Sequence, residues 1–395
     1  MPDIQVVLTE LGWPLAVALA WLSGEFIHRW TRLPRISVYG VVGFGLSQAF
    51  PDALSSGPTS TVTVLANLAF GLILFEFGYR INLRWLRINP WIAVSGLAES
   101  AATFGVVYLI AHLTGMPPLT SLLLASLAMS TSPAGVLRVI NEEDSSGQVT
   151  ERVLHLVAIN CVLAVFTFKV VVGFWVFQTS GSLTQAISHS LIELAVSAAM
   201  GAVLGMLVPA VLRRMGKLAQ DGTIAFALGV ILLVAMARAF DVSPVLATLT
   251  FGLAARHSRV AFSRTERNFG GIGELMTVLL FVFAVSTLEW ERVVDGLGLG
   301  MLLLVARFVV KAVAVGAFAH VGGVSWRKGL LTGVALAPMS VFVTLLLEQT
   351  KYMGIVLVDE LSALAAMTLV LEVFGPIITQ RALVWANETP NKEDL

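Results

Sequence analysis

Residues 130–135 read Ser-Thr-Ser-Pro-Ala-Gly, and they interrupt an apolar run that extends over 119–140. A second apolar run, 329–347, is interrupted at Pro338 in the stretch Leu-Ala-Pro-Met-Ser. Proline removes one backbone N–H and clashes with the preceding helical turn, so each run predicts a helix broken near Pro133 or Pro338. The freed carbonyls and half-helix ends need a polar cavity, because hydrocarbon offers them no hydrogen bonds. Two such breaks predict an ion- or substrate-binding site within a membrane.

The composition of the chain supports the membrane setting. Of 395 residues, 57% are hydrophobic and 13% are charged, and the mean hydropathy is +0.85. Soluble domains carry about 25% charged residues, and one globular core could not hide so much apolar surface from water. The single cysteine, Cys161, leaves no disulfide framework. No phosphate-binding glycine loop, metal-ligand spacing, nucleophile–base set or basic patch is visible, so we expect no cofactor, metal, enzymatic activity or nucleic-acid partner.

The apolar runs predict an all-α polytopic membrane protein with about thirteen transmembrane helices. A span needs about 20 predominantly apolar residues. The predicted segments are 11–28, 36–50, 61–79, 90–113, 119–140, 153–178, 184–212, 222–238, 243–255, 268–288, 297–321, 329–347 and 361–384.

Basic residues alternate between the two sides of these segments. Of 25 Lys and Arg residues, nineteen fall in loops on one side, three on the other, and three inside spans. Positive residues favour cytoplasmic loops. The alternation therefore predicts an N-terminus outside the cell and a C-terminus in the cytoplasm.

An internal repeat is visible when the sequence is shifted by about 206 residues. Phe-Gly-Leu at 44–46 then meets Phe-Gly-Leu at 251–253, and Pro133 falls near Pro338. The first six segments pair with the last six, and because seven helices separate equivalent members, the halves are inverted in the membrane. Inverted repeats with helices broken at matching places are typical of secondary transporters. The alternative is that each proline only kinks its helix.

The predicted organisation is one transmembrane domain, residues 1–385, followed by a short cytoplasmic tail, 386–395. The repeats are expected at about 11–178 and 222–384, joined by a linker helix at about 184–212.

Charged groups inside spans are costly and usually functional. Arg307 and Lys311 lie one helical turn apart on segment 297–321, so both point the same way. Glu99 lies at approximately the equivalent position in the first repeat, and it is the expected counter-ion. Lys311 can lose its proton in an apolar site, which makes it the candidate working group. Arg307 stays charged, so a supporting, structural ion pair is its expected role.

Four other acidic or basic residues within spans receive simpler interpretations. Lys169 and Glu193 lie at equal depth on either side of a turn, which predicts a structural ion pair. Glu25 and Glu372 are assigned nothing beyond lining a dimer face or a funnel.

Five motifs in a fixed order carry a family resemblance. They are Arg-Leu-Pro-Arg-Ile at 32–36, Leu-Phe-Glu-Phe-Gly at 74–78, Thr-Ser-Pro at 131–133, Asn160, and Val-Ser-Pro-Val-Leu-Ala at 242–247. With these spacings the chain resembles the monovalent cation/proton antiporter superfamily, the Na+/H+ exchanger and Kef-like proteins with the NhaA-type fold.

The resemblance implies that segments 5 and 12 are unwound and cross at mid-membrane. Segment 6 of such antiporters presents an Asn-Asp or Asp-Asp pair to the crossing, and segment 11 supplies Lys or Arg. The acid binds a cation or protons in turn, in an elevator-type cycle. The resemblance also implies a homodimer in the cell inner (plasma) membrane, whose partners are lipid, small inorganic ions and protons. By position, the site here comprises Thr131, Ser132, Asn160, Lys311 and Arg307.

The sequence departs from that pattern at the expected acid. The pair reads Asn160-Cys161, and Ser132 stands where some branches have aspartate. A thiol is a poor ligand for Na+ or K+, because hard cations prefer oxygen. Three hypotheses remain open. The chain exchanges a cation for protons with Glu99, Lys311 and backbone carbonyls, or it carries an anion on a net-positive core, or it is a non-transporting sensor or scaffold.

Overall fold

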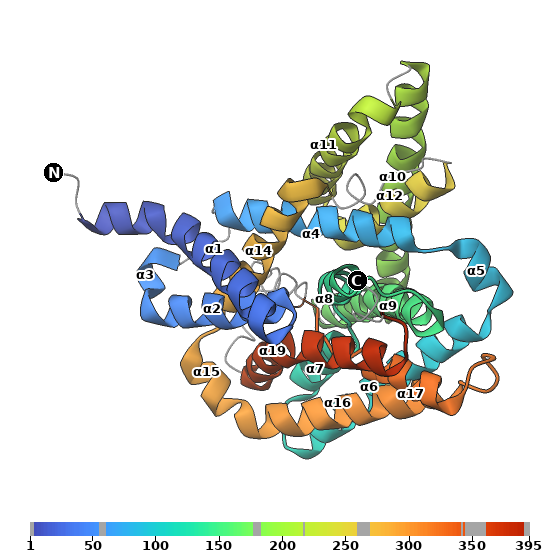
Figure 1. The fold of residues 1–395 in the computed structure, drawn as a ribbon. Helices are drawn as coiled ribbons and strands as arrows, with labels where there is room; N and C mark the ends of the chain where they lie inside the picture. Colours follow the sequence, from blue (N-terminus) through green and yellow to red (C-terminus); the bar gives the residue numbers. More distant parts are fainter. Residues whose placement is uncertain are drawn as a thin grey trace. The chain divides into compact units, whose positions relative to one another are not determined.

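A computed structural model describes residues 4–54, 61–176, 183–215, 218–258, 269–340, 343 and 361–390. Within these ranges the chain is helical, without strands (Figure 1). The helices are α1 (Ile4–Thr31), α2 (Arg35–Ala49), α3 (Pro51–Leu54), α4 (Thr61–Arg80), α5 (Leu83–Ile88), α6 (Trp91–Leu113), α7 (Pro118–Ala128), α8 (Pro133–Glu142), α9 (Gln148–Val176), α10 (Leu183–Arg214), α11 (Leu218–Ala239), α12 (Pro244–His257), α14 (Gly270–Ser286), α15 (Trp290–Asp295), α16 (Leu297–Ala317), α17 (Trp326–Val334) and α19 (Ser362–Trp385).

The predicted segments fall on these helices. Segment 119–140 is divided between α7 and α8, and segment 329–347 begins within α17. Apart from Val343, the part of that segment after residue 340 lies outside the described residues, as does the tail beyond residue 390. In the described part, eight helical segments are long and apolar enough to cross a membrane, and one shorter apolar helix, Gly270–Ser286, accompanies them. The all-α polytopic class is confirmed, whereas the total of thirteen crossings stays a prediction.

The chain divides into two compact units that differ from the predicted repeats. The first unit comprises Met1–Thr63, Asn89–Ala164 and Val278–Leu395, and the second comprises Val64–Ile88 and Val165–Thr277. Each predicted repeat contributes residues to both units. The boundaries of the repeats and of the linker helix therefore stay predictions.

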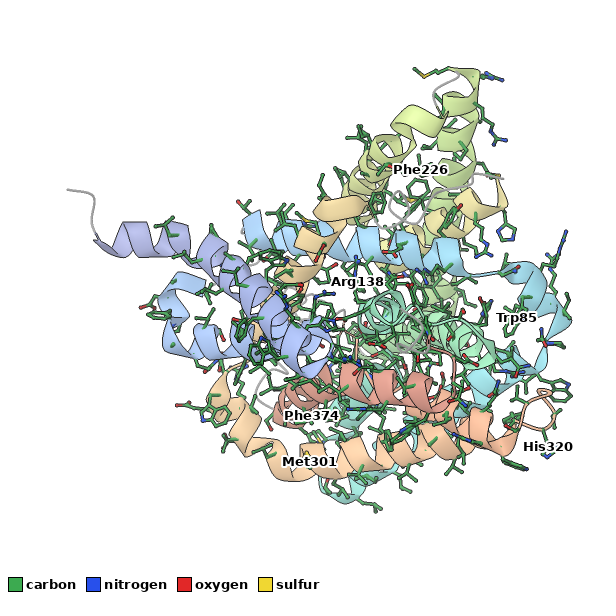
Figure 2. All side chains as sticks on the ribbon, viewed as in Figure 1. Trp85, Arg138, Phe226, Met301, His320 and Phe374 are labelled. Carbon is green, nitrogen blue, oxygen red and sulfur yellow. The ribbon has the colours of Figure 1, made fainter. Side chains whose placement is uncertain are left out.

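In the first unit, α16 packs against α6, α17 and α19 (Figure 1). The contact with α17 is close, because a Cβ added to Gly333 would lie 2.6 Å from the Cα of Ala312. The outer faces of these helices are apolar: Met301 on α16 and Phe374 on α19 are 42% and 55% exposed (Figure 2). Apolar side chains on an outer surface are expected for helices that face lipid.

In the second unit, an aromatic cluster joins α4, α11 and α12. The ring of Phe75 lies 4.8 Å from Phe251 and 5.3 Å from Phe226, which is labelled in Figure 2. A Cβ on Gly252 would collide with the backbone oxygen of Phe75. The Phe-Gly pair that marks the predicted repeat therefore serves close helix packing at this position.

Candidate functional site

The first helix break lies between α7 and α8. Helix α7 ends at Ala128, residues 130–132 are not helical, and α8 begins at Pro133. Proline suits the first position of a helix, where its missing N–H would have no partner in any case. The hydroxyl of Ser132 caps α8 by accepting a 3.0 Å hydrogen bond from the Gly135 amide. The Ser-Pro sequence thus restarts the helix after the interruption.

The second break follows α17 and crosses the first. Residues 337–340 are not helical, and the Pro338 carbonyl accepts a 3.0 Å hydrogen bond from the Ser132 amide. The Thr131 hydroxyl donates to the Leu336 carbonyl at 3.4 Å. Two segments 205 residues apart in sequence therefore share hydrogen bonds at their unwound parts. This is the crossing that the two prolines and the family resemblance led us to expect.

Arg307 links both breaks through backbone oxygens. Its Nε donates to Ala128 at 2.8 Å, and its two terminal nitrogens donate to Ser130 and Ala337, each at 2.7 Å. The residue is 1% exposed. The planar guanidinium suits this task, because its donors have a fixed fork geometry. Arg307 therefore satisfies carbonyls that the interrupted helices leave without intrahelical partners.

Lys311 lies one turn further along α16 and faces three oxygen atoms. Its Nζ lies 2.5 Å from Glu99 Oε1, 3.1 Å from the Met129 carbonyl and 3.4 Å from Thr131 Oγ1. Lys311 is 1% exposed and Glu99 is fully buried. The ammonium group thus forms a buried ion pair beside the first break.

The carboxyl group of Glu99 is only partly engaged by its neighbours. The Thr103 hydroxyl donates to Oε1 at 3.1 Å, which is the oxygen that also contacts Lys311. Among the described residues, Oε2 has no hydrogen-bond partner although it is buried. Glu99, Lys311 and Arg307 together leave one net positive charge at the crossing.

The Asn160-Cys161 pair of α9 lies at the same crossing. Asn160 accepts a 2.9 Å hydrogen bond from Ser100 through Oδ1, and its Nδ2 donates to Thr131 Oγ1 at 3.3 Å. Cys161 Sγ donates to the Thr131 carbonyl at 3.3 Å. Where an aspartate would place a negative charge, the thiol places a weak donor that helps to hold the break.

The remaining predicted pair lies in the second unit. Lys169 Nζ is 2.9 Å from Glu193 Oε1, and both side chains are about one-tenth exposed, at 12% and 10%. Each is the other's ion-pair partner, which is the arrangement that their equal depth predicted.

Sequence reasoning missed the hydroxyls of Ser100 and Thr103. Both lie on α6 beside Glu99 and contact Asn160 or the Glu99 carboxylate. The sequence did contain a signal for them. Glu99 and Ser100, with Thr103 one turn later, form a polar group within an otherwise apolar span.

A buried ion pair at the crossing of two helix breaks, in a polytopic chain, defines an ion-handling membrane transport protein. The chain belongs to the sodium/hydrogen exchanger family, because the family's transmembrane profile matches residues 15–385. This confirms the resemblance to the monovalent cation/proton antiporter superfamily. Comparison with curated proteins gives no match.

Similar solved structures include two of the sodium proton antiporter MjNhaP1 from Methanocaldococcus jannaschii. One, at pH 8, is 14% identical, covers 96% of each chain and has a TM-score of 0.65. The other, an electron-microscopy map, is 17% identical, covers 98% of this chain and 97% of that one, and has a TM-score of 0.68. At such identity the likeness shows the fold alone. The family is one of transporters, and membership in it supports a cation/proton antiporter.

Proposed function

We propose that this protein exchanges a monovalent cation for a proton, with Lys311 and Glu99 as the exchanging pair. One observation carries the proposal: Lys311 Nζ occupies a position that three oxygens surround, from Glu99, Met129 and Thr131. Carboxylate, carbonyl and hydroxyl oxygens are the ligands that hard cations prefer. The ammonium therefore stands where a cation of the same charge would be stabilised.

The exchange follows from competition for these oxygens. When the N–H bond of Lys311 releases its proton to water, the neutral amine no longer balances Glu99, and a cation takes its place against the carboxylate. The reverse step begins when Lys311 accepts a proton and displaces the cation. Both loaded states carry the same charge at the crossing, because a bound monovalent cation replaces one ammonium charge.

Glu99 supplies the acid that Cys161 lacks. The free Glu99 Oε2 offers one further ligand position, since no described residue contacts it by a hydrogen bond. The acid then comes from α6 instead of α9, while Asn160 keeps its contact with Thr131. The loss of a carboxylate at residue 161 is compatible with cation exchange for this reason.

The anion hypothesis is weaker on the same geometry. A cationic core binds an anion only if it has donors to spare. The three Arg307 nitrogens that contact the breaks are already bonded to Ala128, Ser130 and Ala337. Lys311 is paired with Glu99. The net positive charge therefore has no open cluster of donors around it.

The finer features of the proposal rest on family grounds and on charge. We propose an elevator-type cycle, a homodimer, and placement in the plasma membrane with the N-terminus outside, as the alternation of basic residues favours. Na+ and K+ are the proposed cargoes. The two helix breaks, α6, α16 and the part of α9 that carries Asn160 and Cys161 all belong to the first compact unit. In an elevator-type cycle the whole site can therefore move as one body and keep its internal contacts.

Reconstitution tests the function directly. Purified protein in liposomes with an enclosed pH-sensitive dye should move protons when Na+, K+ or Li+ is added outside between pH 6 and 9. Choline, added at equal ionic strength, is the control. A response to none of the three cations, with protein shown to be folded and inserted, would overturn the proposal. Chloride or organic-anion flux in the same vesicles would instead favour the anion hypothesis.

A further inference from the structure

A second acidic residue, Glu372 on α19, is buried, and the described residues include no charged partner for it. Its side chain belongs to the first unit and is 3% exposed. Among the described residues, Glu372 Oε1 makes no hydrogen bond, and no salt bridge involves this carboxyl. An isolated carboxylate in a low-dielectric interior is so costly that the group is expected to carry a proton there.

The surroundings of Glu372 on the α2 side are apolar. A Cβ added to Gly40 of α2 would lie 3.5 Å from Glu372 Cγ, and side-chain atoms of Val285 and Val373 border the same position. An added Cβ at residue 40 would thus be in ordinary van der Waals contact with the aliphatic part of Glu372. The atoms that lie nearest this position are all aliphatic carbons.

On its other side, Glu372 reaches the level of the second break. The Thr379 hydroxyl donates to the Ala335 carbonyl at 3.0 Å, and Gly375 packs so closely on Pro338 that an added Cβ would lie 2.7 Å from its Cα. The break therefore runs antiparallel to α19. From the spacing of these two contacts we infer that Ser340 lies at the level of Glu372.

Ser340 is itself fully buried, and its hydroxyl has no hydrogen-bond partner in the described part of the chain. Unpartnered buried polar groups are uncommon and call for an explanation. The Ser340 hydroxyl and Glu372 Oε1 are therefore two buried oxygen atoms that are not hydrogen-bonded to each other. Two oxygen-bearing side chains are too few to replace the shell of a metal cation, which takes about six or more oxygens in the Ca2+ and Mg2+ sites of proteins. A proton needs only one.

The same break connects this pair to the crossing. Its Ala337 carbonyl accepts a hydrogen bond from Arg307, while Ala335 and Pro338 contact α19. A shift of the break during cation exchange would alter the surroundings of Ser340 and Glu372 together. This provides a physical route by which occupancy at the crossing and ionisation at α19 influence each other.

We propose that Glu372 is a second proton-binding site, which takes up and releases one proton per transport cycle through its O–H bond, with Ser340 as its neighbour. This inference rests on the proposed exchange at Lys311 and Glu99 and adds a stoichiometry to it. Two protons then move against one monovalent cation, and each cycle carries one net charge. Without Glu372 the exchange is one for one and electroneutral.

The ratio of protons to cations tests the inference. In proteoliposomes on a solid-supported membrane, the wild type should give cation-driven currents. Glu372→Gln should retain cation-driven proton movement but lose the current, and Glu372→Asp should keep it. Glu289→Gln is the matched control, because that glutamate is largely exposed, with 64% of its side chain accessible. An electroneutral wild type, or an unchanged current in Glu372→Gln, would overturn the inference.

Infrared difference spectroscopy separates this inference from the proposed function. Cation-free wild-type protein should show a protonated carboxylic acid band that is absent from Glu372→Gln and present in Glu289→Gln. That result requires no transport. If the wild type moves no protons with any cation, the proposed function fails. If the band is unchanged by Glu372→Gln, the second proton site fails instead.

Discussion

Replacing Arg307 by Met should destabilise the crossing more than any single surface change. The substitution removes three hydrogen bonds, to Ala128, Ser130 and Ala337, and leaves these carbonyls buried. Interhelical hydrogen bonds in a membrane are worth about 0.6 kcal/mol on average and about 1.7 at most. Three such bonds give a loss of roughly 2–5 kcal/mol in the free energy of unfolding.

A conservative variant sharpens that expectation. Arg307→Lys keeps the positive charge but lacks the planar fork, so it cannot reach three separated carbonyls in the same way. It should lose a large part of the stabilisation. Arg292→Gln is the control, since Arg292 pairs with Glu289 at a partly exposed surface, 2.8 Å away on the same stretch of chain. Surface pairs contribute about 0–1 kcal/mol.

Chemical unfolding in detergent, followed by tryptophan fluorescence, would measure these differences. Hydrogen exchange of the backbone amides would show where the structure is destabilised, because Arg307→Met should increase exchange around both breaks, at residues 129–132 and 335–340. If Arg307→Met lowered the unfolding free energy no more than Arg292→Gln does, the three bonds would not hold the crossing together, and this reasoning would be wrong.

Two further predictions concern the acids at the crossing. Cys161→Asp places a carboxylate next to Thr131 and should raise the apparent cation affinity at least about tenfold, about 1.4 kcal/mol, as measured by cation-dependent proton flux; an unchanged affinity would show that residue 161 does not face the bound cation. Glu99→Gln should abolish exchange and, by leaving Lys311 buried without a counter-ion, lower the unfolding free energy by about 3–5 kcal/mol. The double variant Glu99→Gln/Lys311→Met should recover stability but not exchange, and recovery of both would contradict the assigned roles.

The sequence was sufficient to locate the breaks and the helix that faces them. Proline has a local effect on any helix, so Pro133 and Pro338 could be interpreted without a structure. Arg307 and Lys311 were found because charges within an apolar run are costly. Their common face followed from helical periodicity. Glu99 was found as a counter-ion through the approximate repeat.

The contacts of these residues were less accessible to sequence reasoning. Arg307 bonds to backbone carbonyls, and a carbonyl carries no residue identity that a sequence pattern could reveal. The supporting ion pair expected for Arg307 is replaced by these three contacts, whereas Lys311 makes the ion pair with Glu99. Glu372 and Ser340 lie on different elements, and the inference that relates them depends on the packing of α19 against the break, which the sequence does not reveal.

The number of protons released when a cation binds tests the central claim most directly. Detergent-purified protein in weakly buffered solution can be titrated with Na+ or K+ while the released protons are counted, and the slope of log affinity against pH gives the same number. Cation displacement of a proton from Lys311 predicts that Lys311→Met binds the cation more tightly and releases one proton fewer per cation than the wild type. Equal proton release by the two proteins would contradict the proposed exchange at Lys311 and Glu99.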